Sequence, residues 1–168
     1  MNIILIGMPG CGKSTVGVLL AKSLLSNFVD TDLIIQYKYI KSLCDIISDE
    51  GLEVFKEKEN KVLAELSVEN SVIATGGSAV YCPEGMKNLK NCGKAIYLKL
   101  SPEEIKGRIK NITTRGIAMK EGTTIEELYD ERSTLYEKYA DITIDCENTT
   151  PEECVNKIIE NLKSKIQN

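Results

Sequence analysis

Short apolar runs recur along the chain, and longer stretches with helical spacing of apolar residues separate them. The runs are Ile3–Ile6, Phe28–Val29, Val72–Ala74, Ala95–Leu100 and Ile142–Ile144. Each resembles a buried strand, because a parallel strand covered on both faces is apolar along its whole length. The alternation predicts an α/β fold, a three-layer sandwich in which a five-stranded parallel sheet is flanked by helices.

The intervening stretches predict the helices and one long loop. We expect helices over 13–26, 42–49, 53–68, 101–110, 124–139 and 151–165, and a helical segment spanning about 33–69. Ser101-Pro102 and Thr150-Pro151 each place a capping hydroxyl before a proline, as at the first turn of a helix. The stretch from about 111 to 124 is polar and lacks apolar periodicity, so we expect a mobile loop that serves as a lid.

The composition of the chain argues against several classes of protein and of binding partner. The 168 residues suit one domain, 1–168, and the net charge of −4 argues against a nucleic acid or an anionic membrane as partner. The chain has no histidine, and its six cysteines form no C-x-x-C pair, which argues against a zinc site and histidine-based catalysis. No segment resembles a signal peptide or a membrane span. We therefore expect a cytoplasmic monomer with reduced thiols.

The segment Gly7–Thr15, directly after the first apolar run, is the strongest motif in the chain. It reads GMPGCGKST and matches the phosphate-loop pattern G-x-x-x-x-G-K-[ST] in its strand-loop-helix context. Backbone amides of such a loop surround the phosphates of a nucleotide, Lys13 reaches the β- and γ-phosphates, and the Ser14 hydroxyl ligates Mg²⁺. The predicted nucleotide-binding residues are Gly10, Cys11, Gly12, Lys13, Ser14 and Thr15.

Two carboxylates, Asp30 and Asp32, follow the second predicted strand. Ligands of open parallel sheets bind beyond the carboxyl ends of the strands, which is also where the phosphate loop lies. Phosphoryl transfer needs an ion beside the phosphates and an aligned acceptor hydroxyl, so one carboxylate serves each task. The alternative is that this Asp-x-Asp is only a turn or a helix N-cap.

The ordered motifs resemble the shikimate kinase family over essentially the whole chain. They are the phosphate loop, Asp30-Thr31-Asp32, the Phe55–Glu59 segment, Thr75-Gly76-Gly77, Arg108, Thr114-Arg115 and Glu131-Arg132. The resemblance implies a phosphate-loop kinase that transfers phosphate from ATP, with Mg²⁺, to the 3-hydroxyl of shikimate. It also implies residue roles: Mg²⁺ at Asp30, the acceptor hydroxyl at Asp32, adenine at Arg108, the transferring phosphate at Arg115, and shikimate at Lys56, Gly76, Gly77 and Arg132.

Three positions depart from the family pattern. Lys56 stands where the family usually has arginine, with Glu59 as its expected partner, and a lysine supplies charge without the bidentate geometry of guanidinium. Ser78 replaces the third glycine of the usual triplet and adds a hydroxyl. Gly116 replaces the proline of the usual Arg-Pro, so we expect a more flexible lid. These changes bear on substrate affinity more than on the type of reaction.

Two other functions remain open from the sequence. One is a phosphate-loop kinase for another small hydroxyl substrate, such as gluconate or a nucleoside monophosphate. The other is a nucleotide-binding module without turnover, since a fold and a motif do not by themselves establish activity. A binding module would have no need of Asp32 on the acceptor side.

Overall fold

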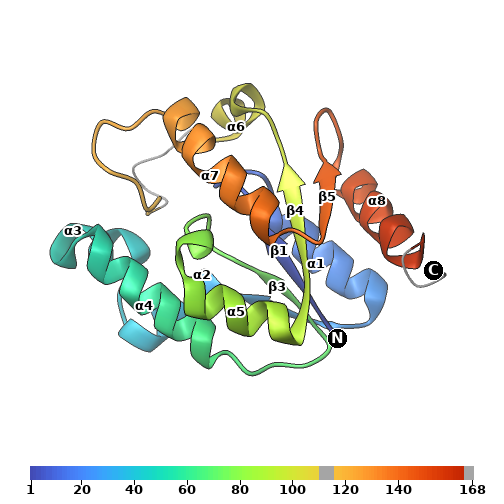
Figure 1. Cartoon of the computed structure of the whole chain (residues 1–168), viewed down its shortest axis with the longest axis horizontal. Coiled ribbons are helices and arrows are strands. Elements are labelled where there is room, and N and C mark those ends of the chain that lie inside the picture. The colour runs from blue at the N-terminus through green and yellow to red at the C-terminus, as the bar shows by residue number, and fades with distance from the viewer. Residues whose placement is uncertain (110–115, 165–168) are drawn as a thin grey trace.

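The computed structural model describes residues 1–109 and 116–164 of the chain. One parallel sheet of five strands lies at its centre, in the order β2-β3-β1-β4-β5 (Figure 1). The strands are β1 Asn2–Ile6, β2 Asn27–Asp30, β3 Ser71–Ala74, β4 Gly93–Lys99 and β5 Ile142–Asp145. In the middle of the sheet, Ile4 of β1 pairs with Ile73 on one side and Ala95 on the other. The predicted fold class is confirmed.

Helices cover both faces of the sheet and complete the three layers (Figure 1). Helices α1 (Lys13–Leu24) and α8 (Pro151–Ser164) pack together on one face, and α5 (Pro83–Cys92) and α7 (Ile125–Tyr139) lie on the other. Helices α2 (Thr31–Tyr39), α3 (Leu43–Glu50) and α4 (Leu52–Glu65) follow β2, the 3₁₀ turn η1 (Ala79–Tyr81) follows β3, and α6 (Pro102–Arg108) follows β4. No helix in the described ranges is long and apolar enough to cross a membrane.

The predicted caps fix the starts of two helices. The Ser101 hydroxyl accepts the N–H of Glu104 at 3.3 Å, and the Thr150 hydroxyl accepts the N–H of Glu153 at 3.2 Å. Each cap satisfies an amide that the first helical turn leaves free, which is worth about 1 kcal/mol. Because α6 and α8 begin just after β4 and β5 end, these caps also shape the edge of the sheet where ligands bind.

The apolar interior consists of two clusters. The larger surrounds the sheet and includes all of β1 from Ile3 to Ile6. The smaller lies among α2, α3 and α4 and contains Ile35, Leu43, Ile46, Phe55, Val62 and Ala118. Ala118 comes from the segment 116–124, which forms no helix or strand. The second cluster therefore joins the helices after β2 to the end of the loop before α7.

Two helices were not predicted individually. Helix α2 begins at Thr31, inside the Asp-x-Asp motif, for which the sequence indicated two functional carboxylates and a turn or helix N-cap only as the alternative. Helix α5 carries Gly85 in its first turns, a poor helix former, although Pro83 at its first position is a start signal. Gly85 packs on Leu63, where an added Cβ would lie only 2.5 Å from the Cβ of that residue. The close approach of α4 and α5 thus explains a glycine that weakens the sequence pattern.

The packing around residue 116 explains why a glycine is found there, which the sequence alone did not show. The φ of Gly116 is +62°, and an added Cβ would lie 2.7 Å from the Leu43 Cβ and 2.8 Å from the Cys44 nitrogen. A side chain there would meet backbone of α3, which cannot move aside cheaply. The glycine is therefore required by tight packing against α3, and proline, whose φ is near −65°, is incompatible with this position. The predicted lid residues 111–115, Arg115 included, lie outside the described residues.

Candidate active site

A cleft of about 520 Å³ opens at the carboxyl edge of the sheet. The predicted site residues on its wall are Gly10, Gly12, Lys13, Ser14, Thr15, Asp32, Gly76, Gly77, Arg108 and Arg132. Cys11, Asp30 and Lys56 are not part of the wall that the structure describes, and Arg115 lies outside the described residues. The fold thus brings together residues more than a hundred positions apart in the sequence.

The phosphate loop runs from the end of β1 to the first turn of α1. Gly12 caps α1 with a φ of 96°, and the residues of the first turn, Lys13, Ser14 and Thr15, line the cleft beside it. The Lys13 ammonium is buried and donates to the carbonyl oxygens of Gly7 at 2.7 Å and Met8 at 2.9 Å. Helix N-terminal amides and a buried cation together make a site that attracts polyphosphate.

Ser14 and Asp30 form a contact between α1 and the end of β2. The Ser14 hydroxyl donates to Asp30 Oδ2 at 2.7 Å, and Asp30 Oδ1 accepts the N–H of Asp32 at 3.0 Å. Asp30 is therefore the N-cap of α2, so the capping interpretation of the motif is correct for this residue. The Ser14 and Asp30 oxygens are also hard donors of the kind that Mg²⁺ prefers, so their chemistry fits this ion. The described residues contain no group of three acidic, cysteine or histidine side chains that could bind a metal.

Asp32 and Glu59 place two carboxyl groups beside Gly76. An added Cβ on Gly76 would lie 2.6 Å from Glu59 Oε1 and 2.7 Å from Asp32 Oδ1, so only glycine fits here. Both oxygens are buried and lack a hydrogen-bond partner among the described residues. Burial, followed by the nearby Asp30 charge, raises the pKa of Asp32 to about 6, although Lys13 opposes this shift. Burial likewise raises the pKa of Glu59 to about 7, with the Ser78 hydrogen bond acting in the opposite direction.

We predict that Glu59→Gln removes a pH dependence of stability. The folded protein keeps the Glu59 proton up to a pKa of about 7, whereas the unfolded chain releases it near 4.5. Stability of the wild type therefore falls as the pH rises between these values, because a fully buried carboxyl must become charged. Urea unfolding at about pH 5 and about pH 8 measures this change. We expect Glu59 to lower the free energy of unfolding of the wild type by about 3 kcal/mol between these pH values, and the Glu59→Gln variant not to show this decrease. The exposed Glu57 on the same helix provides the control Glu57→Gln, and equal pH slopes for Glu59→Gln and wild type would contradict the assignment.

Arg132 of α7 is a buried cation on the wall of the cleft. Its side chain is 1% exposed, and Nη2 donates to the carbonyl oxygen of Ala118. Nε and Nη1 have no hydrogen-bond partner among the described residues, and the guanidinium lies 5.2 Å from the centre of the Tyr81 ring. A buried guanidinium with free donors is costly unless an anion meets it. This arrangement suits a carboxylate, whose two oxygens match the guanidinium.

Lys56 does not have the partner that the sequence predicts. Its ammonium pairs with Glu53 Oε1 at 3.0 Å and lies 5.0 Å from the centre of the Tyr81 ring. The expected partner, Glu59, accepts a hydrogen bond from Ser78 instead, at 2.6 Å. The prediction of a Lys56–Glu59 pair is therefore wrong. On a helix, position 53 is as close to position 56 as position 59 is, and Glu53 is exposed while Glu59 is buried.

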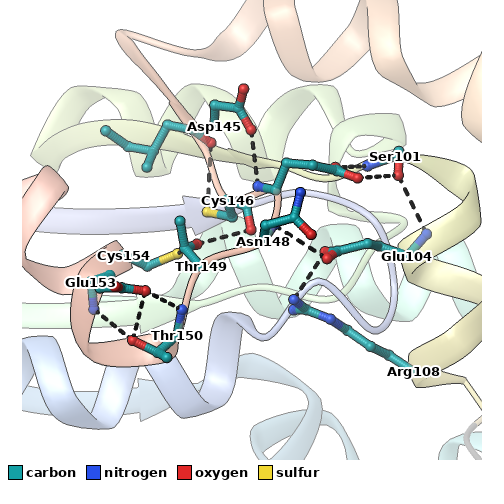
Figure 2. A network of polar contacts seen from close by, with 12 residues as sticks. Ser101, Glu104, Arg108, Asp145, Cys146, Asn148, Thr149, Thr150, Glu153 and Cys154 are labelled. Atoms are coloured by element: carbon teal, nitrogen blue, oxygen red, sulfur yellow. Dashed lines mark hydrogen bonds and ion pairs between the residues drawn. The ribbon is translucent and has the colours of Figure 1, made fainter.

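Arg108 belongs to a polar network at another part of the cleft (Figure 2). Glu104 accepts from Arg108 Nη2 at 3.1 Å and from the N–H of Asn148 at 3.2 Å, and so links α6 to the loop after β5. Pro151, the first residue of α8, lines the cleft as Arg108 does. Sequence reasoning missed Pro151 and Glu104 as site residues. It interpreted Pro151 only as a helix start.

Comparisons with known proteins show which family this chain is similar to. A family model described as shikimate kinase matches residues 9–163. A curated shikimate kinase from Enterococcus faecalis is 38% identical over 165 residues, covering 96% of this chain and 98% of that protein. A structure of a shikimate kinase from Acinetobacter baumannii in complex with shikimate has a TM-score of 0.91 at 32% identity and covers 98% and 93% of the two chains. The shikimate kinase structure from Aquifex aeolicus has a TM-score of 0.84 at 34% identity and covers 99% and 98%.

Proposed function

The chain belongs to the shikimate kinase family, and from this premise we propose how its cleft transfers phosphate from ATP to the 3-hydroxyl of shikimate. The enzyme is a kinase that produces ADP and shikimate 3-phosphate. The observation that best supports these roles is that one cleft is lined by the phosphate-loop lysine, a carboxylate and a buried guanidinium with free donors. Donor binding and acceptor binding thus share one cavity.

The phosphate loop binds the donor. The amides of Gly10, Gly12 and Thr15 bind the phosphates, and Lys13 stabilises the charge that develops on the β- and γ-phosphate oxygens. The Cys11 N–H, which the sequence also assigned to phosphate binding, donates instead to the Met8 carbonyl at 3.2 Å. Ser14 and Asp30 would bind Mg²⁺, which when present neutralises phosphate charge. The Ser14 hydroxyl and the Asp30 carboxylate lie 2.7 Å apart, and an ion held by them would also need oxygens from the phosphates of ATP, as is usual for Mg²⁺ in kinases. Arg108 and Pro151 line the part of the cleft assigned to adenine.

Asp32, Gly76, Gly77 and Arg132 bind the acceptor. Asp32 accepts a hydrogen bond from the acceptor hydroxyl, orients its oxygen towards the γ-phosphate, and takes the proton as the bond forms. Gly76 and Gly77, which line the cleft, contact the ring of shikimate through their backbone. Arg132 pairs with the carboxylate of shikimate. The Tyr136 hydroxyl donates to the Gly77 carbonyl at 2.6 Å, so α7 also fixes the backbone on which the ring lies.

We propose that Arg115 and the segment around 111–124 also act in the reaction. The resemblance assigns Arg115 to the transferring phosphate, where a planar guanidinium suits the spread of negative charge. Closure of this segment over the cleft excludes water and limits wasteful hydrolysis of ATP. We also propose that the protein acts as a cytoplasmic monomer without nucleic acid, which its net charge of −4 and its six free thiols support.

An ADP-release assay with Mg-ATP tests the substrate. Shikimate, gluconate and several nucleoside monophosphates are offered separately over a wide concentration range. We expect only shikimate to stimulate ADP release, because it alone among these acceptors has both a carboxylate to pair with Arg132 and a carbon ring to lie on the Gly76 and Gly77 backbone. Gluconate also carries a carboxylate, so it is the sharpest competitor. Stimulation by gluconate or a monophosphate alone would favour another kinase, and no stimulation by any acceptor would favour a binding module.

We predict that Lys56→Arg lowers the KM for shikimate about fivefold, with kcat and the KM for ATP unchanged. A guanidinium reaches farther and offers paired donors to a carboxylate, an advantage of about 1 kcal/mol. Steady-state kinetics measures the change. Lys58→Arg on the same helix is the matched control, because Lys58 pairs with Glu50 and lies against Tyr39 instead of Tyr81. An unchanged KM for Lys56→Arg would mean that position 56 does not act on the acceptor.

A further inference from the structure

The Ser78 hydroxyl contacts the buried carboxyl of Glu59. It donates to Glu59 Oε2 at 2.6 Å, and both residues are almost completely buried. Ser78 lies in the loop after β3, at the start of η1, while Glu59 lies on α4. The bond therefore ties the helices after β2 to the wall of the cleft. Ser78 itself lines the cleft.

Glu59 lies behind that wall and touches it through its other oxygen. Oε1 and Asp32 Oδ1 both lie against Gly76, each within 2.7 Å of the position that a Cβ on this residue would occupy. Asp32 lines the cleft, but its Oδ1 is buried, so Oδ2 is the oxygen that can meet an acceptor hydroxyl. The position of Glu59 Oε1 thus limits how the Asp32 carboxyl can rotate.

The cationic side chains near Glu59 do not take over the hydrogen bond that the Ser78 hydroxyl donates to its carboxyl. Lys56, three residues before Glu59 on α4, pairs with Glu53. Arg132 donates to the Ala118 carbonyl, and within the described residues no hydrogen bond joins it to Glu59. The Cys82 thiol is a weaker donor that also lowers the pKa of Glu59. Loss of the Ser78 hydroxyl would leave the buried carboxyl with one weak donor among the described residues.

We propose that Ser78 is a positioning residue for the acceptor, whose hydroxyl orients Glu59 so that Glu59 in turn orients Asp32 and the Gly76 backbone. This inference rests on the proposed roles of Asp32 and Gly76 in binding shikimate. When Oε2 is fixed by Ser78, Oε1 must point at Gly76, because the carboxyl is planar. The Asp32 carboxyl then has one orientation in which Oδ2 faces the cleft. Binding of the acceptor depends on this chain of contacts, and binding of ATP does not.

The test compares Ser78→Ala and Ser78→Thr with wild type by steady-state kinetics. Removal of a hydrogen bond to a buried carboxyl group corresponds to a change of about tenfold, so we expect Ser78→Ala to raise the KM for shikimate about tenfold. The KM for ATP should stay within about twofold of wild type. Ser78→Thr keeps the hydroxyl and should restore the KM for shikimate. Ser71→Ala is the matched control, because Ser71 is a buried serine at the opposite end of β3 whose hydroxyl donates to the nearby Glu69 carbonyl at 2.8 Å.

A double-mutant cycle with Glu59→Leu separates positioning from general destabilisation, because leucine cannot accept the Ser78 hydrogen bond. If Ser78 acts through the Glu59 carboxyl, the effect of Ser78→Ala should shrink to less than about twofold when residue 59 is leucine. An equal effect in both backgrounds would overturn the proposal, as would a rise in the KM for ATP that matches the rise for shikimate. A Ser78→Thr variant with the same rise in the KM for shikimate as Ser78→Ala would also overturn the proposal. If wild type does not phosphorylate shikimate at all, the proposed function itself fails, which is a distinct outcome.

Discussion

Replacing Lys13 with Met is expected to lower kcat by about a hundredfold to a thousandfold. The Lys13 ammonium is buried in the phosphate loop, where it donates to the carbonyl oxygens of Gly7 and Met8. In this low-dielectric position its charge stabilises the transferring phosphate far more than a solvated cation would. Methionine has a similar length and no charge, so the loss falls on the transition state. A coupled ADP-release assay at saturating shikimate and ATP measures the change.

Lys22→Met on the same helix is the control for this prediction. Lys22 is exposed in the last turn of α1, so its loss should leave kcat within about twofold of wild type. Thermal unfolding of both variants shows whether the loop stays folded without the two Lys13 hydrogen bonds. A folded Lys13→Met variant with near-normal turnover would show that the ammonium is structural, and the proposed donor site would be wrong.

Asp32→Asn is expected to lower kcat at least about a hundredfold while binding of ATP persists. Asparagine keeps the size and the N–H of residue 32, so Asp30 can still cap α2. It cannot take the proton of the acceptor hydroxyl. Turnover with shikimate and, separately, calorimetric binding of an ATP analogue distinguish these effects. Asp130→Asn, at an exposed position of α7, is the control.

The pH profile offers a second measure of Asp32. Burial raises the pKa of this carboxyl to about 6, so it becomes protonated at a pH where an exposed aspartate stays charged. A protonated carboxyl cannot accept the hydroxyl proton, and wild-type kcat/KM for shikimate, which reports the free enzyme, should therefore fall as the pH drops through about 6. The remaining activity of Asp32→Asn should lack this fall. A variant with full turnover, or with the same acidic fall, would mean that Asp32 is not the base.

Much of the donor site could be predicted from the sequence, because its parts are local. The phosphate loop is one continuous segment in which Gly12 and Lys13 are neighbours, and the strand before it and the helix after it follow from apolar spacing alone. The caps at Ser101 and Thr150 depend on residues three positions away, so they were predicted correctly as well. Local geometry needs no knowledge of the remaining chain.

Contacts between distant elements could not be predicted in this way. The sequence suggested a pair of Lys56 with Glu59, yet Lys56 pairs with Glu53 and Ser78 bonds to Glu59 across the gap between α4 and the loop after β3. Helix spacing allowed both partners for Lys56, and burial of Glu59 decided between them. The need for glycine at 116 likewise appears only when this segment packs on α3.

The sequence by itself determined the fold class, the phosphate loop and the residue types needed for phosphoryl transfer, because these depend on apolar periodicity and on short motifs. Only the tertiary structure decided which oxygen of Asp32 faces the cleft, that Arg132 is buried with free donors, and that Ser78 fixes Glu59. The physical reason is that burial and hydrogen-bond partners are set by how α2, α4, α7 and the end of β3 pack together. That packing brings together residues whose separation in the chain carries no distance information.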